Sequence, residues 1–301
     1  MHAAARHRLA LTLLFITPAL WAVNALIARK AGGVIEPHLL AMMRWLLASG
    51  LFAIGTHTEI WTHRRQVLAD WKHYLVLGAL GMWICGAWVY IGGHTTSAAN
   101  IGLIYAISPV LIVLASALWL GESFRLRQAL GVALALAGVL HVVLKGQWAA
   151  LAAVQFVPGD GWILAATLSW TLYSLLLKKW HSPLGLGARL ALISLAGALI
   201  NLPFALWEVF ANPLPALSLE GGALALTAAI IPGFGAYLAH SYMQRELGAA
   251  QVSVVLYLSP IYTALMAWAV LGEGLSAFHL WGMALVLPGI YLVTRTGTPA
   301  R

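Results

Sequence analysis

The sequence predicts an all-α integral membrane protein whose ten transmembrane helices form two inverted five-helix repeats. Apolar residues make up 61% of the 301 residues and charged residues only 9%, which is too little charge to cover the surface of a water-soluble globule. Apolar runs of about 20 residues, the length that crosses a bilayer as a helix, recur along the whole chain. The two halves of the chain also match each other in sequence. These three observations are justified in turn below.

Apolar windows bounded by charged residues, proline or glycine predict the individual spans. The first window follows Arg6 and Arg8, a start that is also typical of a secretory signal peptide. We expect a retained first helix instead, because its apolar stretch continues to Ala28 and the repeat described below includes it. The spans are predicted near residues 9–28, 37–56, 74–93, 98–120, 127–144, 161–177, 184–207, 221–243, 249–271 and 278–294.

Basic residues predict the orientation of these spans. With a cytoplasmic N-terminus, only Arg29, Lys30 and Lys145 of the 17 lysines and arginines fall in outer loops, and Arg44 and Arg189 fall within spans. The other 12 lie in inner segments, as the positive-inside rule requires. We therefore expect a multi-pass protein in the lipid bilayer of the bacterial inner (plasma) membrane, with both termini cytoplasmic. The same distribution explains the net charge of +8, so no nucleic-acid partner is expected.

An internal repeat divides the chain into residues 1–146 and residues 147–301, each with five predicted spans. Because five is odd, the second copy must lie upside down relative to the first. Inverted repeats are typical of secondary transporters, which bind their substrate near the bilayer midplane. A shift of 151 residues superposes Ala98-Ala99 on Ala249-Ala250, Ser108-Pro109 on Ser259-Pro260, and Leu120-Gly121-Glu122 on Leu271-Gly272-Glu273.

The repeated Ser-Pro pairs are candidates for the substrate cavity. Ser108 with Pro109, and Ser259 with Pro260, lie about halfway along spans four and nine, where proline removes a backbone hydrogen bond and kinks the helix. The carbonyls four residues before each proline, at Tyr105 and Leu256, then need a helix, a water or a ligand as partner. A kink that only shapes helix packing explains the same residues equally well.

Aromatic residues supply the other cavity candidates. Trp21 and Trp170 occupy matched positions inside spans one and six, away from the membrane interfaces where tryptophan usually collects. Two such side chains could form walls of a central cavity or could fill space between helices. Asn24 and Tyr173 lie three residues further on, on the same helix faces. We add four candidates from spans three, eight and nine: Trp88, Tyr90, His240 and Tyr257.

Four charged residues complete the candidate set. Arg44 lies roughly 10 Å into span two by the helical rise, and such an arginine either extends outward to the interface or binds a carboxylate. Because Arg189 is its counterpart at the start of span seven, we favour a structural role common to both arginines over ligand binding. Glu122 and Glu273 follow spans four and nine on opposite sides of the membrane and are candidates for helix caps or paired gates. We find no acidic residue near midplane that predicts a carboxylate proton relay.

The sequence carries no signature of an enzyme or of a metal or cofactor site. Cys85 is the single cysteine and lies in an apolar run, so a CxxC motif or multi-cysteine metal site is impossible. His94, His141 and His240 are the histidines that an enzyme could use, but HExxH, GxSxG and paired aspartates are missing. We expect no metal and no cofactor. A passive channel is the other non-enzymatic alternative.

The order and duplication of these motifs resemble the drug/metabolite transporter superfamily, in its ten-helix EamA-like branch. That resemblance implies a basket of helices in which spans one, three, four, six, eight and nine form the cavity and spans five and ten are peripheral. It further implies export of amino acids, and the aromatic cavity is similar to that of the aromatic amino acid exporters of the branch. It is carried by residues 21–30, 37–47, 95–109, 120–122, 248–260 and 271–273.

The leading hypothesis is therefore an exporter of neutral amino acids, aromatic ones included, that works by alternating access. Ser108 stands where some aromatic exporters carry a larger residue, so a wider range of substrates fits the same site. The alternative within the transporter class is export of drugs, nucleosides or other small metabolites. From another class, a polytopic membrane enzyme is the weaker alternative. The sequence predicts neither the energy coupling nor an oligomeric state.

Overall fold

The computed structural model describes residues 3–93, 95–122, 125–211, 218–271, 274 and 276–294. All regular elements within these ranges are helical, which confirms the all-α prediction for the described part of the chain. Eight helical segments there are long and apolar enough to cross a membrane: Ala5–Ala28, Pro37–Ile54, Asn100–Trp119, Leu126–Val143, Leu186–Ala211, Leu219–Leu247, Ala249–Met266 and Ala277–Thr294.

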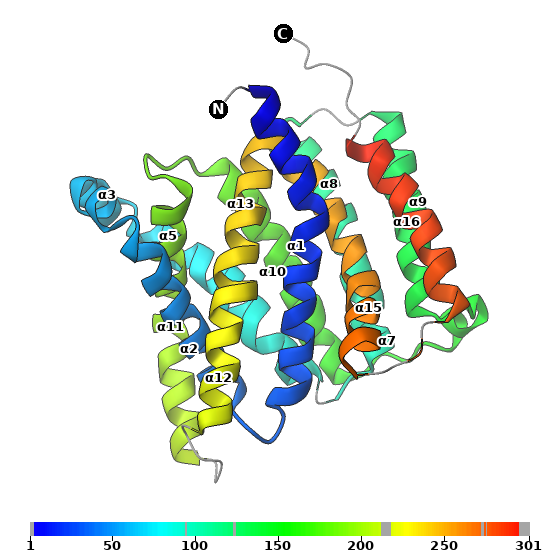
Figure 1. Ribbon diagram of the computed structural model, residues 1–301, viewed down its shortest axis with the longest axis horizontal. Helices are drawn as coiled ribbons and strands as arrows, with labels where there is room; N and C mark the ends of the chain where they lie inside the picture. Colours follow the sequence, from blue (N-terminus) through cyan, green and yellow to red (C-terminus); the bar gives the residue numbers. More distant parts are fainter. Residues whose placement is uncertain are drawn as a thin grey trace.

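The two other predicted spans are also helical, in the stretches 71–93 and 158–179, but they are not among those eight, so the count of ten crossings stays a prediction. Figure 1 shows the long helices packed side by side, with the beginning of α1 and the end of α16 at the same end of the bundle. The α-helices are α1 (Ala3–Ala31), α2 (Pro37–Ile54), α3 (His57–Thr62), α4 (Arg64–Ala69), α5 (Trp71–Gly78), α6 (Val89–Gly93), α7 (Ala98–Ala106), α8 (Ser108–Trp119), α9 (Leu126–Val143), α10 (Pro158–Lys179), α11 (Leu186–Ala211), α12 (Leu219–Ala228), α13 (Ala236–Leu247), α14 (Ala249–Ser253), α15 (Ser259–Leu271) and α16 (Ala277–Thr294).

Two helices contain π-helical segments at corresponding places in the two halves. Ala79–Trp88 joins α5 to α6, and Ala229–Gly235 joins α12 to α13. A π-helical turn leaves backbone carbonyls that need other partners, and in the first segment side chains from three different helices supply them. Ser169 of α10 donates to the Leu80 carbonyl at 2.9 Å, Tyr237 of α13 to Gly81 at 3.0 Å, and Trp45 of α2 to Met82 at 3.0 Å. The widened turn therefore holds α2, α10 and α13 around it.

The helices break at both Ser-Pro pairs. α7 ends at Ala106 and α8 begins at Ser108, and in the second half a 3₁₀ segment, Val254–Leu258, precedes α15. The tightened turns supply the partners that the sequence left open. The Ile107 N–H is directed at the carbonyls of Ile104 and Tyr105, and the Ser259 N–H at the carbonyl of Leu256. For the Leu256 carbonyl, the expectation of a neighbouring helix, a water or a ligand as partner is therefore wrong.

Glycines allow a close helix contact, which joins α9 to α16 in antiparallel directions. A Cβ atom added at Gly131 would lie 2.6 Å from the Gly289 carbonyl oxygen, and one at Gly138 would lie 2.7 Å from that of Gly282. No side chain fits between backbones this close, so glycine is required at both positions of α9. In the 151-residue repeat Gly131 matches Gly282 and Gly138 matches Gly289, so the contact is reciprocal.

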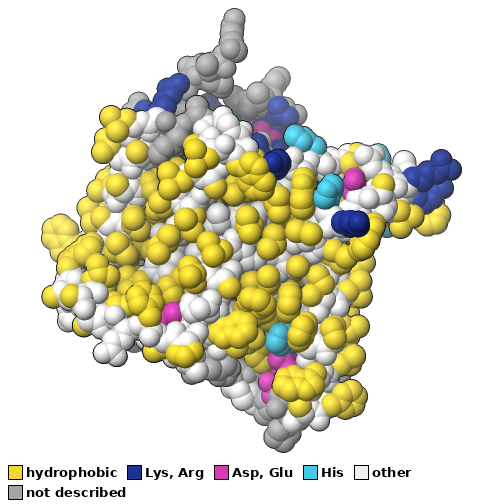
Figure 2. Space-filling view, turned by 180° about the vertical axis from the view of Figure 1, so that it is seen from behind, with side chains coloured by type: hydrophobic (Ala, Val, Ile, Leu, Met, Phe, Trp, Pro, Cys, Tyr) yellow, Lys and Arg dark blue, Asp and Glu magenta, His cyan; other side chains and the backbone are white. Residues whose placement is uncertain are grey.

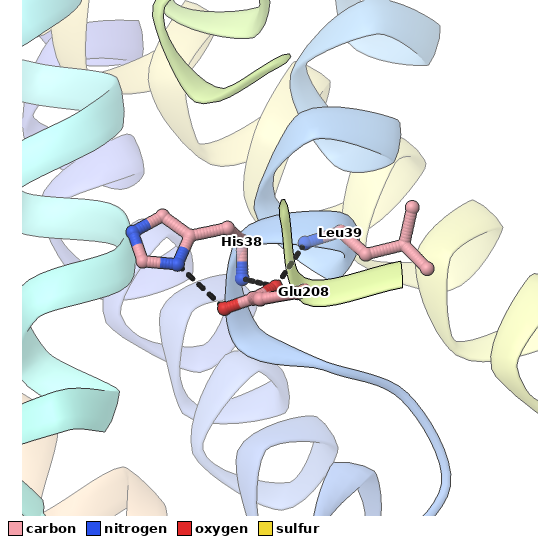
Figure 3. Close-up of polar contacts among 3 residues, drawn as sticks. All are labelled: His38, Leu39 and Glu208. Carbon is pink, nitrogen blue, oxygen red and sulfur yellow. Dashed lines mark hydrogen bonds and ion pairs between the residues drawn. The ribbon is translucent and has the colours of Figure 1, made fainter. Parts of the chain in front are cut away.

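A buried carboxylate joins α11 to the first turn of α2 (Figure 3). The Glu208 carboxylate accepts from the backbone N–H groups of His38 at 2.9 Å and Leu39 at 3.1 Å, and it meets the His38 ring Nδ1 at 2.6 Å. Glu208 is 6% exposed and His38 9%. A carboxylate at a helix N-terminus satisfies otherwise unpaired N–H groups and complements the helix dipole. This contact therefore caps α2 from 170 residues away.

Candidate functional site

A cavity of about 810 Å³ lies inside the helix bundle. Its wall includes the predicted spans one, three, four, six, eight and nine, and also α2, α9 and the beginning of α16. The resemblance implied peripheral fifth and tenth spans, and the structure corrects this, because α9 contributes three valines to the wall. The lining residues are Trp21, Asn24, Ala25, Arg44, Trp45, Cys85, Gly86, Ile101, Gly102, Tyr105, Ala106, Ser108, Val139, Val142, Val143, Lys145, Trp170, Tyr237, Leu256, Tyr257, Ser259, Pro260, Thr263, Ala264, Gly274 and His279.

Aromatic rings from three helices meet at one corner of this cavity. Trp21 of α1 contacts Trp170 of α10 edge-on, with ring centroids 5.6 Å apart, and Tyr237 of α13 lies 6.4 Å from the first ring and 5.9 Å from the second. The two tryptophans therefore form one continuous aromatic surface and not two opposite walls. Such a surface offers both ring faces and ring edges to an apolar or aromatic ligand.

Arg44 places a positive charge in the cavity wall. It is 7% exposed, its Nη1 donates to the Asn24 Oδ1 at 2.8 Å, and its guanidinium lies 4.5 Å from the centroid of the Trp45 ring. Lys145 adds a second positive charge where α9 ends. Within the described lining there is no aspartate or glutamate. The cavity therefore has a positive electrostatic character in a setting of low dielectric constant, which strengthens its attraction for an anionic group.

Three lining residues carry hydrogen-bond donors that have no protein partner within the described structure: the Trp170 indole N–H, the Ser108 hydroxyl and the Tyr257 hydroxyl. All three residues are at most 8% exposed. A buried donor without a partner costs free energy, so each is an opportunity for a ligand or a water that reaches it. Ser259 and Pro260 also line the cavity, so both Ser-Pro breaks face it.

Several predicted residues lie behind the cavity wall. The Tyr173 ring stacks on Trp170 with centroids 5.3 Å apart, and the His240 ring lies 5.2 Å from Trp170, so both support the aromatic corner without lining it. Pro109 is buried away from the cavity, in α8. Trp88 is not in the wall and packs instead against Trp162, at 5.0 Å.

The other charged candidates lie at helix ends. The Glu122 carboxylate accepts from the N–H groups of Ala249 at 3.1 Å and Ala250 at 3.0 Å, so it caps α14 in the other half of the chain. Arg189 donates to the carbonyls of Leu177 at 2.9 Å and Trp180 at 2.7 Å. Glu273 and the side chain of Tyr90 lie outside the described residues.

Sequence reasoning missed lining residues, above all Trp45 and Lys145. Adjacent helix positions point about 100° apart, so Arg44 and Trp45 are not expected to face the same space. The Arg44 side chain reaches it by folding over the Trp45 ring. From the sequence, Tyr237 could not be distinguished from the other polar residues of span eight. None of these three positions carries a local signal in the sequence, because their exposure to the cavity depends on how the helices are rotated against each other.

Several lining residues of the cavity lie towards one end of the bundle. Gly102 near the start of α7, Lys145 after α9 and His279 in the first turn of α16 all line it. These positions lie at the end opposite to the beginning of α1 (Figure 1). At the α1 end, the Glu122 carboxylate holds the end of α8 to the start of α14.

Comparisons with known proteins match nearly the whole chain. The sequence model of the EamA-like transporter family matches residues 8–144 and 157–295. An uncharacterized transporter of Archaeoglobus fulgidus is 28% identical over 290 residues, which cover 94% of this chain and 96% of that protein. A protein of Streptantibioticus cattleyicolor, described as a probable terminal-alkyne amino-acid exporter, is 28% identical over 242 residues, or 77% of this chain and 76% of that protein. A solved crystal structure has the same fold with a TM-score of 0.75 at 23% identity, over 95% of this chain and 96% of that chain.

Proposed function

Because the chain belongs to the EamA-like transporter family, we propose that it exports neutral amino acids, aromatic ones included, across the bacterial inner membrane. It is a membrane transporter of this type, and the family and the names of its relatives indicate a transporter and not an enzyme. The description of the Streptantibioticus cattleyicolor relative as a probable amino-acid exporter supports this class of cargo.

The observation that carries the proposal is the chemistry of the cavity wall. Arg44 supplies a positive charge for a carboxylate, next to the aromatic corner of Trp21, Trp170 and Tyr237, which suits an apolar or aromatic side chain. The ammonium group of the amino acid would lie against ring faces, which attract cations. Because the described lining holds no carboxylate, a purely cationic drug finds no counter-charge there.

The alternative cargo, nucleosides or other small metabolites, is favoured by the same aromatic surface, which also stacks on flat heterocycles. A nucleoside would not pair with the charge on Arg44, because a nucleoside carries no carboxylate. The two cargo classes therefore differ in one testable respect, which is whether transport depends on that arginine.

For the transport cycle we propose alternating access between two inverted five-helix repeats, residues 1–146 and 147–301. The reciprocal glycine contacts of α9 and α16 are what a two-fold axis in the membrane plane produces. The paired π-helical segments and the Ser-Pro breaks at matched positions support the same symmetry. Ten crossings would also leave the two chain ends on one side, in agreement with the placement of α1 and α16 in Figure 1.

We assign the α1 end of the bundle to the cytoplasm. Figure 2 shows hydrophobic side chains over the middle of one face, with the Lys and Arg side chains of that face gathered towards this end. Such an asymmetry is the signature of the positive-inside rule. In this orientation the cavity opens to the outside, and the contact of Glu122 with α14 closes the cytoplasmic side.

Counterflow in proteoliposomes tests the cargo. We expect aromatic and aliphatic neutral amino acids to exchange with saturable kinetics, whereas a flux that never saturates would indicate a channel. Arg44→Gln removes a charged donor worth about 1.5–3 kcal/mol, which corresponds to roughly a ten- to hundredfold loss of apparent affinity for an amino acid. Arg64→Gln, which changes an exposed arginine, is the matched control.

Trp170→Ala completes the design by removing the centre of the aromatic corner. It should weaken transport of tryptophan and phenylalanine more than transport of alanine. If no amino acid is transported while nucleosides or other metabolites are, the cargo assignment is wrong and the transporter assignment stands. If Arg44→Gln leaves the affinity for every transported amino acid unchanged, the role of the arginine is refuted.

A further inference from the structure

A second, smaller pocket lies at the α1 end of the bundle, away from the central cavity. It encloses about 260 Å³, several times the roughly 30 Å³ of one water molecule in the liquid. The pocket is formed where α10 ends, where α11 begins and along the last two turns of α13. Its lining residues are Leu177, Lys178, Trp180, His181, Ser182, Leu184, Leu186, Arg189, Leu190, Ser241, Gln244 and Arg245.

Three basic side chains from three helices converge on this pocket. Lys178 belongs to the last turn of α10, Arg189 to the first turn of α11 and Arg245 to the last turn of α13. No aspartate or glutamate lines the pocket. Two carboxylates lie close by. That of Glu246 lies 3.4 Å from the Arg245 Nε and 3.9 Å from the Arg6 Nε, and that of Glu59 accepts from the backbone N–H of Gly185, between two lining residues, so together they offset part of the charge. The lining keeps a clear positive excess.

The backbone holds the central cation in place. The Arg189 guanidinium donates to the carbonyls of Leu177 and Trp180 at the end of α10, which fixes its plane and uses two of its five N–H donors. A fixed guanidinium loses little side-chain entropy when it binds a planar or tetrahedral oxyanion. The site for an anion is therefore largely formed before the ligand arrives.

Polar side chains of α13 add hydrogen-bonding capacity beside these charges. Gln244 donates from Nε2 to the Ser174 carbonyl at 2.7 Å, which orients its amide and leaves its Oε1 without a partner in the described structure. The Ser241 hydroxyl is likewise without a partner. Gln244 is 3% exposed and Ser241 4%. A ligand that carries hydroxyl groups besides its charge would supply the donor that the amide oxygen needs.

Basic residues at helix C-termini also complement the helix dipole, and this explains Lys178 and Arg245 one at a time. It explains neither the concave space between them nor the buried polar groups on its wall. We propose that this pocket binds the phosphate group of an anionic phospholipid with a hydroxylated headgroup, such as phosphatidylglycerol. Basic pockets between transmembrane helices are known to take such headgroups. The proposal holds for any cargo of the central cavity.

Native mass spectrometry of the full-length protein tests this site. Protein released from nanodiscs with equal amounts of phosphatidylglycerol and phosphatidylcholine should retain phosphatidylglycerol in at least tenfold excess. The double variant Lys178→Gln with Arg245→Gln should lose most of that preference. The double variant Arg64→Gln with Lys72→Gln removes the same charges from exposed positions outside the pocket and should keep it.

The source of the phosphate is tested by titrating inorganic phosphate and glycerol 1-phosphate against the retained lipid. Displacement of phosphatidylglycerol from the unaltered protein by either ion, and not by chloride at equal ionic strength, would show that the phosphate group is what the pocket recognises. Stabilisation by the free ions alone, lost in the pocket double variant, would assign the site to a soluble phosphate and overturn the lipid assignment. Equal retention by both double variants would refute the site altogether.

Discussion

The contact between Glu208 and the start of α2 gives the sharpest stability prediction. Replacing Glu208 with alanine leaves two buried backbone N–H groups, those of His38 and Leu39, and the His38 ring without their acceptor. Each buried donor that loses its acceptor costs about 1–3 kcal/mol, and towards the low end of that range the three contacts amount to about 3–5 kcal/mol. At roughly 2 °C per kcal/mol for a chain of this size, the Tm of Glu208→Ala should fall by about 6–10 °C.

Glu208→Gln separates the hydrogen bonds from the charge. One amide oxygen can accept from both backbone N–H groups, as Oε2 does in the carboxylate, and the amide NH₂ can donate to Nδ1 of the neutral His38 ring. Only the charge assistance is lost, which costs about 1 kcal/mol. The Tm should therefore fall by roughly 2 °C.

Thermal unfolding of the purified protein in one detergent, followed by tryptophan fluorescence, measures these differences. Glu220→Ala and Glu220→Gln are the matched controls, because Glu220 lies exposed in the first turn of α12. The reasoning is refuted if Glu208→Ala unfolds within 1 °C of the Glu220 control. It is also refuted if the glutamine variant is as unstable as the alanine variant, since the hydrogen bonds would then not be the stabilising element.

Two further predictions concern the contacts between the halves of the chain. Gly138→Ala places a Cβ atom 2.7 Å from the Gly282 carbonyl oxygen and should destabilise the folded protein by about 1–3 kcal/mol. The control Gly50→Ala, at a position in α2 with open space around it, should keep or raise the Tm. Equal Tm values for the two variants would contradict the close packing of α9 and α16. Glu122→Gln weakens the cap of α14 and should cost about 1 kcal/mol. In the proposed orientation, in which this contact closes the cytoplasmic side, the variant should also make the cavity more reactive to a thiol reagent added from inside. Unchanged labelling of Cys85 would contradict that role.

Residues with local consequences were predictable from the sequence. The helix breaks lie at Pro109 and Pro260 because a proline lacks its N–H wherever it stands. By contrast, the close contact of α9 and α16 was not predicted, although its glycines repeat at a spacing of 151 residues, because the repeat does not say which helices approach each other.

The partners of the charged residues were not predictable in the same way. Glu122 was a candidate for a helix cap or a gate, and the structure places it against the start of α14, 127 residues further along the chain. No role was predicted for Glu208 from the sequence, although its carboxylate binds the start of α2. A carboxylate near a helix end indicates that it accepts hydrogen bonds from backbone N–H groups. Which helix supplies those N–H groups depends on the packing of elements that are distant in the sequence.

The candidate site, too, was predictable in part from the sequence and in part only from the structure. Composition, apolar run lengths and the repeat by themselves determined an all-helical membrane protein with aromatic and Ser-Pro positions near its centre, because lipid demands long apolar helices and internally satisfied backbones. Only the tertiary structure decided that Trp45 and Tyr237 join Trp21 and Trp170 around the cavity while Trp88 does not. The physical reason is rotational: an apolar helix in lipid carries no polar face that fixes its orientation, so its neighbours determine which side chains reach the interior.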